Sequence, residues 1–224
     1  MGKMGTVAKT RVGRVAAVKP TERLVPDLLV AGLIDVETTG LDRYRDDIVE
    51  LSIVLFSFRP DRGEIIEVID TYVGLQEPSK PISQGAARVH GIAGDQVRGK
   101  SLDFDKVSAM LTRAHLLIAH NATFDYAFVT RLFAHAVERP WYCTMNGIDW
   151  RKEGYRSKGL QNLLAAHGVE VARAHRALND VNGVFELLVC RAQSGEPYLC
   201  QLVRGAPAIE PAPSAAAPGQ RGEG

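Results

Sequence analysis

A nearly continuous apolar run close to the start of the chain constrains the fold more than any other feature. Residues 28–36 are apolar apart from Asp35, which is typical of a central strand buried on both faces. Such a strand needs other strands beside it and helices above and below it. The chain has 224 residues, enough for one domain with a sizeable core.

The rest of the pattern predicts a mixed sheet. Two more strands are expected at 48–58 and 65–75, and the polar stretches 42–47 and 59–63 suit turns between antiparallel strands. Further along, short strands are expected at 116–119 and 141–144, and helices near 83–89, 104–114, 123–135, 160–167 and 177–192. Three strands followed by strand–helix repeats indicate an α/β fold with a mixed sheet covered by helices.

The ends of the chain differ in composition from the middle. Residues 1–27 form an expected basic arm in which Glu22 is the only acid before Asp27. A solvated arm is favoured over an electrostatic tether or a transit peptide. Residues 205–224 are rich in Pro, Ala and Gly, which predicts a flexible tail. The folded domain is therefore expected at 28–204.

Charge and cysteine content exclude some classes of protein. The formal net charge is +1, which neither indicates nor excludes a nucleic-acid ligand. Three cysteines without a Cys-x-x-Cys pair argue against a disulfide framework or a zinc site and fit the cytoplasm. No apolar run reaches the ~18 residues of a membrane span, so no membrane partner is expected.

Acidic residues follow the buried strand and begin two of the helices. Asp35 and Glu37 are two residues apart at the end of the strand, so their side chains project from one face. Asp125 and Asp180 are expected in the first turns of their helices, and His175 on the loop before the second. Any one of these acids alone is also typical of a solvated strand end or a helix N-terminus.

Together these residues predict a metal-dependent site. Carboxylate oxygens suit hard cations such as Mg²⁺ or Mn²⁺, and two such ions about 3.5–4 Å apart can clamp the oxygens of a phosphoryl displacement. An imidazole such as that of His175 can accept a proton from the attacking water.

The three segments 33–40 (LIDVETTG), 120–125 (HNATFD) and 175–180 (HRALND) resemble the Exo I, Exo II and Exo III motifs of the DEDDh 3′→5′ exonucleases. The resemblance spans about 28–192. It implies an RNase H-like fold with a five-stranded mixed sheet. It also implies that Asp35, Glu37, Asp125 and Asp180 bind two divalent cations, and that His175 is the general base. The sister branch has a tyrosine where this chain has Arg176, which favours the histidine branch.

The same resemblance suggests residues that contact the substrate. Thr38 is expected to bind the terminal 3′-hydroxyl through its backbone, and Leu41 to contact the last base. His90 and Asn121 are expected near the substrate, although for all four a purely structural role is equally open.

We therefore expect a 3′→5′ exonuclease that releases nucleoside monophosphates from single-stranded 3′ ends, with DNA favoured. An RNA exonuclease is the alternative, and a nuclease-like subunit that binds without cutting is a third hypothesis. Residues 201–204 (QLVR) do not resemble the clamp-binding segment of polymerase-associated relatives, so a polymerase partner is not evident. Related enzymes include dimers, which leaves a homodimer open.

Overall fold

The structure is a computed structural model that describes residues 27–170 and 174–209. Its centre is a five-stranded sheet with the order β3-β2-β1-β4-β5. The strands are β1 (Leu29–Thr38), β2 (Ile48–Arg59), β3 (Glu64–Leu75), β4 (Leu116–Ala119) and β5 (Trp141–Cys143). The first three are antiparallel, and β4 and β5 run parallel to β1. The prediction of a five-stranded mixed sheet is confirmed.

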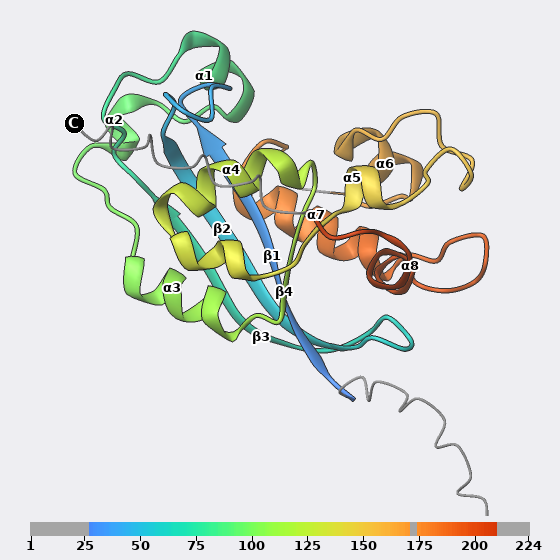
Figure 1. The fold of residues 1–224 in the computed structure, drawn as a ribbon. Helices are drawn as coiled ribbons and strands as arrows, with labels where there is room; N and C mark the ends of the chain where they lie inside the picture. The colour runs from blue at the N-terminus through green and yellow to red at the C-terminus, as the bar shows by residue number, and fades with distance from the viewer. Residues whose placement is uncertain (1–26, 171–173, 210–224) are drawn as a thin grey trace, which may run out of the picture.

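Helices cover both faces of this sheet (Figure 1). The helices α3 (Phe104–Arg113) and α4 (Ala122–Leu132) lie on one face, and α7 (Ala177–Val189) lies on the other. The remaining helices are α1 (Gln84–His90), α2 (Gly94–Val97), α5 (Thr144–Gly147), α6 (Leu160–Ala166), α8 (Tyr198–Gly205) and the 3₁₀ helix η1 (Ala134–Glu138). None of the helices in the described part of the chain is long and apolar enough to span a lipid bilayer.

The apolar run 28–36 forms the central strand β1, as predicted. Ile34 and Val36 pack in the core under α3 and α4, whereas Ala31 and Leu33 pack in the core under α7. Because successive side chains of a strand alternate between faces, Asp35 belongs to the α7 side of the sheet. The alternation that builds the two cores therefore also aims this carboxylate at α7.

Several expected elements have bounds that differ from the observed ones; the helix expected at 177–192, for example, ends at Val189. The helix expected at 123–135 ends at Leu132, and Phe133 leaves the helical conformation (φ −124°) with its ring only 3% exposed. Phe133 thus lies between the end of α4 and the start of η1. The strand expected at 141–144 ends at Cys143, and Thr144 begins α5.

The boundary of the C-terminal tail also moves. The tail was expected from Gly205, but α8 includes Gly205, and the peptide N of Ile209 donates to the carbonyl of Trp141 at 2.8 Å. Ile209 also packs on the core beneath α4. Residues through Ile209 therefore belong to the folded domain. The predicted arm and the rest of the predicted tail lie outside the described residues, apart from Asp27.

Candidate active site

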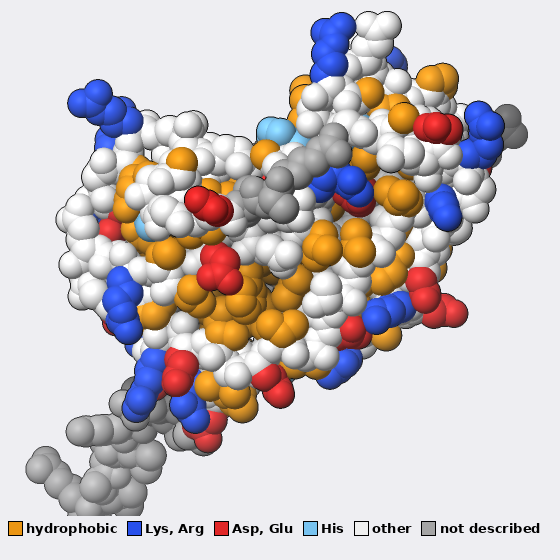
Figure 2. Space-filling view, turned by 180° about the vertical axis from the view of Figure 1, so that it is seen from behind, with side chains coloured by type: hydrophobic (Ala, Val, Ile, Leu, Met, Phe, Trp, Pro, Cys, Tyr) orange, Lys and Arg blue, Asp and Glu red, His pale blue; other side chains and the backbone are white. Residues whose placement is uncertain are grey.

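The C-terminal end of β1 forms the floor of a cleft of about 820 Å³. One wall comes from α1, and the other from the start of α4, from α5 and from α6. From the far side of the molecule, Figure 2 shows the surface dipping between two projecting parts, with a histidine side chain exposed in the dip. A cleft of this size is in the range of pockets that bind small ligands.

Three of the four predicted acids meet at this floor. Carboxylate oxygens of Asp35, Glu37 and Asp180 all lie within 4.8 Å of one another. Asp35 and Glu37 come from β1, and Asp180 comes from the first turn of α7, where it is 5% exposed. The predicted shared face of the two strand acids is therefore consistent with the geometry, and α7 supplies the third carboxylate.

The fourth acid reaches the same place from the opposite face. Asp125 is in the first turn of α4 and is 2% exposed. Its Oδ1 accepts a hydrogen bond of 3.2 Å from the peptide N of Val36, between the two strand acids. Its charge also raises the pKa of Asp35. Asp125 thus adjoins the cluster, although it is outside the group of three that lies within 4.8 Å.

The acids of this cluster have raised pKa values, mainly because they are withdrawn from water and, for Asp35, Glu37 and Asp180, also because their charges repel. Burial, followed by repulsion from Asp125, Glu37 and Asp180, raises the pKa of Asp35 well above its ordinary value. Burial is also the main reason why the pKa of Glu37 rises to about 8 and that of Asp125 to about 8. Burial raises the pKa of Asp180, an effect that His175 and Gln161 partly offset. Crowded carboxylates of this kind fit a hard divalent cation, which would remove the repulsion.

Of the three histidines that line the cleft, two already use both ring nitrogens. In His90, Nδ1 accepts from the peptide N of Ile92 at 3.0 Å, so Nε2 carries the proton and donates to the carbonyl of Thr38 at 3.2 Å. His120 bonds the carbonyl of Lys158 through Nε2 at 2.9 Å and Thr144 Oγ1 through Nδ1 at 2.8 Å.

Burial keeps both of these histidines uncharged at neutral pH. It lowers the pKa of His90, and it lowers that of His120 to about 4. His175, in contrast, is exposed and lines the cleft beside Asp180. It lies on the loop before α7, as predicted, with a φ of 57° that is uncommon outside glycine. Of the three rings, that of His175 is the best placed to exchange protons with a ligand in the cleft.

The predicted substrate contacts all line the cleft, but they differ in exposure and in hydrogen bonding. Thr38 is 5% exposed, and its hydroxyl donates to the carbonyl of Gly40 at 2.6 Å, so it has no proton left to donate to a ligand. Leu41 is 86% exposed. Asn121 occupies the N-cap position of α4 with a φ of 68° and makes no side-chain cap hydrogen bond. The side chain of Asn121 therefore does not cap α4, and Thr123 lies inside the helix.

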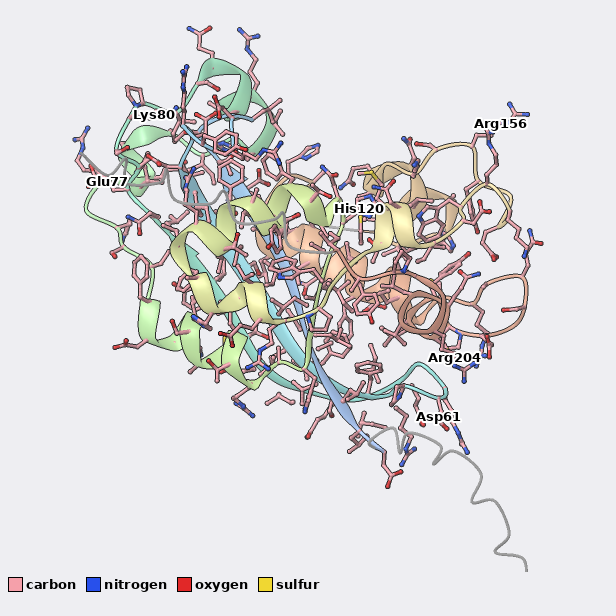
Figure 3. The ribbon with its side chains drawn as sticks, in the orientation of Figure 1. Asp61, Glu77, Lys80, His120, Arg156 and Arg204 are labelled. Atoms are coloured by element: carbon pink, nitrogen blue, oxygen red, sulfur yellow. The ribbon has the colours of Figure 1, made fainter. Side chains whose placement is uncertain are left out.

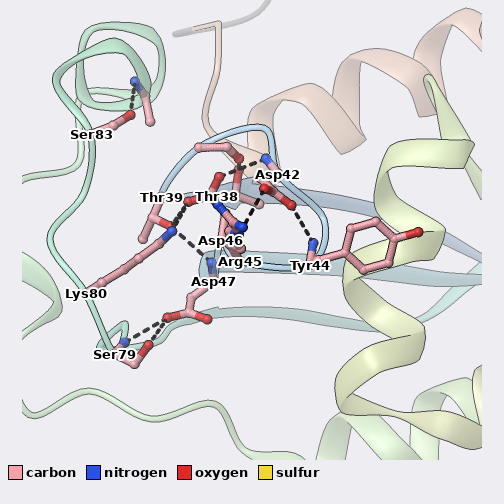
Figure 4. Close-up of polar contacts among 12 residues, drawn as sticks. Thr38, Thr39, Asp42, Tyr44, Arg45, Asp46, Asp47, Ser79, Lys80 and Ser83 are labelled. Carbon is pink, nitrogen blue, oxygen red and sulfur yellow. Dashed lines mark hydrogen bonds and ion pairs between the residues drawn. The ribbon is translucent and has the colours of Figure 1, made fainter.

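The loop that carries Leu41 is fixed by one buried acid, Asp46 (Figure 4). Its carboxylate accepts from Thr39 Oγ1 at 2.9 Å and from the peptide N of Asp42 at 2.8 Å, and it pairs with Lys80 at 2.5 Å. A Cβ atom on Gly40 would lie 2.5 Å from Asp46 Oδ2. A side chain at position 40 would therefore displace the Asp46 carboxylate that holds this loop.

The sequence analysis assigned no role in the site to Glu50, Arg176 or Gln161. Glu50 of β2 is the cross-strand partner of Glu37 and is 1% exposed, with Arg176 bound to its carboxylate. The sequence could have indicated a role for Glu50, because it is the only charged residue in the expected strand 48–58. Gln161 of α6 donates to Asp180 Oδ1 at 2.9 Å, and nothing in its sequence context indicated this.

The sequence is similar to those of known exonucleases and polymerases. The exonuclease family RNase T matches residues 33–188. The PolC-type DNA polymerase III of Thermotoga maritima is 29% identical over 185 residues, which cover 74% of this chain and 12% of the relative. The chain thus spans about an eighth of the length of this curated relative.

Solved structures share the fold. Escherichia coli exonuclease I in complex with a dT13 oligonucleotide has a TM-score of 0.57 and 18% identity, covering 70% of this chain and 40% of that one. Exonuclease X in complex with 5′-overhanging duplex DNA has a TM-score of 0.51 and 24% identity, covering 76% and 99%. Because the family match covers most of the described domain, from β1 to α7, this chain belongs to the RNase T family of exonucleases, as the three acidic segments predicted.

Proposed function

We propose that this chain is a 3′→5′ exonuclease that hydrolyses the terminal phosphodiester of single-stranded nucleic acid and releases nucleoside monophosphates. The observation that carries the proposal is the convergence of Asp35, Glu37 and Asp180 in a cleft that His175 also lines. The family match supports the same reaction class.

The roles of the residues follow from their surroundings. Asp35, Glu37, Asp125 and Asp180 would hold two divalent cations, Mg²⁺ or Mn²⁺, because their oxygens are crowded and their pKa values are raised. When bound, such cations stabilise the negative charge that develops on the reacting phosphate. His175 accepts the proton of the attacking water, since the rings of His90 and His120 are held by other hydrogen bonds.

The cleft supports a strand end as substrate. Its walls carry apolar side chains, including Leu41, Val89 and Phe124, that offer contact surface to bases. The backbone of Thr38 is next to the acids and would bind the 3′-hydroxyl, and His90 holds this backbone through the carbonyl of Thr38. Asn121 lies at the N-cap of α4, one turn before Asp125, and would orient the substrate.

DNA is the favoured substrate. The relatives support it, because they include a DNA polymerase and exonucleases solved with DNA. RNA is the alternative substrate. A polymerase partner, a homodimer and a cytoplasmic location stay predictions.

The test is degradation of 5′-labelled single-stranded DNA and RNA of identical sequence with Mg²⁺, with Mn²⁺ or with EDTA. Wild type should give a ladder that shortens from the 3′ end, only with metal and faster on DNA. Asp180→Asn should give no ladder. Asp61→Asn is the matched control, because Asp61 is exposed on the β2–β3 turn, at the opposite end of the sheet from His120 (Figure 3).

Each other outcome changes the proposal in a defined way. Faster degradation of RNA would replace the DNA preference with the RNA alternative. Tight binding of the strand without cleavage under any metal would support the non-catalytic subunit instead. A ladder that persists in Asp180→Asn would overturn the assignment of this acid.

A further inference from the structure

Glu50 is a buried acid that belongs to the site region but is not among the four crowded acids. Its carboxylate is bound in bidentate fashion by Arg176, with Nε donating to Oε2 at 3.0 Å and Nη2 donating to Oε1 at 2.5 Å. The peptide N of Ala177 also donates to Oε2, at 2.9 Å. These three hydrogen bonds occupy both carboxylate oxygens, which separates Glu50 from the acids that suit a metal ion.

The bonds of Glu50 replace a local cap of α7. Arg176 is at the N-cap position of this helix and makes no side-chain cap hydrogen bond of its own. The first peptide N–H groups of a helix need acceptors, and a negative charge is favourable there. Glu50, on β2, supplies both the acceptor and the negative charge, although it is 127 residues away from Ala177 in the sequence. One carboxylate thus links the central sheet to the start of α7.

The residue beside this link is the proposed base. His175 directly precedes Arg176 and has a left-handed backbone, φ 57°. A non-glycine residue keeps this conformation when its surroundings determine it. On the other side, Asp180 lies one helical turn after Arg176, and its peptide N donates to the Arg176 carbonyl at 3.0 Å. Arg176 is therefore anchored between the two functional residues of the third motif.

We propose that the Glu50–Arg176 pair positions His175 relative to the strand acids, and so is required for the catalytic step although neither residue touches the substrate. This inference rests on the proposed exonuclease function. Glu50 is the cross-strand neighbour of Glu37. Because Arg176 binds Glu50, the pair fixes the loop that carries His175 relative to β1 and β2. Arg176 and Glu50 are positioning residues, and His175 is the residue they act through.

The first arm of the test compares Arg176→Ala, Arg176→Lys and Glu50→Gln with wild type on single-stranded DNA at saturating Mg²⁺. We expect kcat to fall about 10–100-fold in Arg176→Ala, with KM within about threefold of wild type. Arg176→Lys keeps the charge but loses the two-pronged contact, so it should recover part of the activity. Arg59→Ala, which removes an exposed ion pair with Glu64 at 2.8 Å, is the control and should leave kcat unchanged.

The second arm separates positioning from general stability. In the His175→Ala background, Arg176→Ala should lower kcat by less than about threefold, because the residue it positions is already gone. Equal losses of kcat in both backgrounds would overturn the proposal, and so would wild-type kcat in Arg176→Ala. A loss confined to KM would overturn it as well.

A readout without catalysis keeps this inference distinct from the proposed function. Hydrogen exchange of the peptide 174–180 should be faster in Arg176→Ala and Glu50→Gln than in wild type, and unchanged in Arg59→Ala. If wild type proves inactive on every strand, the proposed function fails while the exchange data still report on the link. Unchanged exchange in both pair variants would overturn the link itself.

Discussion

Two sets of acids lie near the end of β1. The first is the buried Asp46, which the protein neutralises, and the second is the partly buried cluster of Asp35, Glu37 and Asp180, which it does not. Asp46 receives hydrogen bonds from Thr39 and Asp42 and an ion pair from Lys80. Burial alone would raise the pKa of Asp46, but these partners lower it below its ordinary value. Within the described residues, no Lys or Arg forms an ion pair with Asp35, and its pKa is raised.

We infer that the difference separates a structural acid from the acids proposed to bind metal. A buried charge without partners costs folding free energy, and Lys80 shows that this fold can place a cation beside an acid in the same region. Leaving the cluster of Asp35 and Glu37 unbalanced therefore indicates a role outside stability. The contrast predicts opposite responses of the two sets to substitution, to pH and to metal.

Asp35→Asn should have the largest effect, and on activity alone. It removes a proposed metal-binding oxygen, so kcat should fall at least about 1,000-fold. The metal-free protein should unfold at the same or a higher urea concentration than wild type, because repulsion in the cluster decreases. Steady-state exonuclease assays and urea unfolding in EDTA check both halves, with Asp61→Asn as control. A clear loss of stability in EDTA would place Asp35 with the structural acids.

Asp46→Ala should show the reverse pattern. It leaves Lys80 and Thr39 without their acceptor, which should lower the free energy of unfolding by about 1–3 kcal/mol. Catalysis should change less than in Asp35→Asn, since Asp46 is outside the group of three carboxylates. Urea unfolding and kcat measured on the same preparations test this. A 1,000-fold loss of kcat without a change in stability would contradict the division between the two sets.

The pH dependence of stability should also have opposite signs. The pKa of Glu37 is raised to about 8 in the folded protein, so the folded state keeps a proton that the unfolded state releases. The stabilising contribution of this group is complete below its unfolded pKa of about 4.3 and is lost as pH rises through about 8. The pKa of Asp46 is lowered, so its contribution is lost only when pH falls below its unfolded value of about 3.9.

Glu37→Gln makes this prediction measurable. In EDTA, wild type should lose stability relative to Glu37→Gln between about pH 5 and pH 8, and saturating Mg²⁺ at the upper pH should cancel the difference. Asp46→Asn should differ from wild type at neutral pH and converge with it in acid. Urea unfolding over this pH series is the measurement. A gap between wild type and Glu37→Gln that is independent of pH would contradict the raised pKa.

The sequence predicted the parts of the site that depend on local periodicity. The alternation of β1 placed Asp35 and Glu37 on one face, and the strand 116–119 was predicted with its observed bounds. First-turn positions of Asp125 and Asp180 followed from helix start signals. These features are fixed by neighbours a few residues away, which a pattern can record.

Contacts between distant segments could not be predicted in this way. Glu50 meets Arg176 across 126 residues, and the pairing depends on the packing of α7 against β2. Asp46 and Lys80 likewise meet only when the chain returns after β3. The charge of Glu50 inside an apolar strand indicated that a partner was needed, but its identity required the fold. The sequence thus revealed the unbalanced acids and missed the partners of the balanced ones.

Leu41→Ala should have the smallest effect on stability and activity. It also tests whether Asp46, which holds the loop of Leu41, contributes to substrate binding. Leu41 is 86% exposed, so stability should stay within about 0.5 kcal/mol of wild type. Loss of apolar contact with the terminal base should raise KM roughly three- to tenfold. Val68→Ala, at a 52% exposed position of β3, is the control and should change neither quantity.

The same substitution in the Asp46→Ala background shows what the structural acid contributes. If Asp46 matters to catalysis only by holding the loop of Leu41, removal of Leu41 should cost little more once the loop is released. Full additivity of the two effects on KM would mean that Leu41 contacts the strand without help from Asp46. Asp46 would then serve stability alone, and the two sets of acids would be functionally independent.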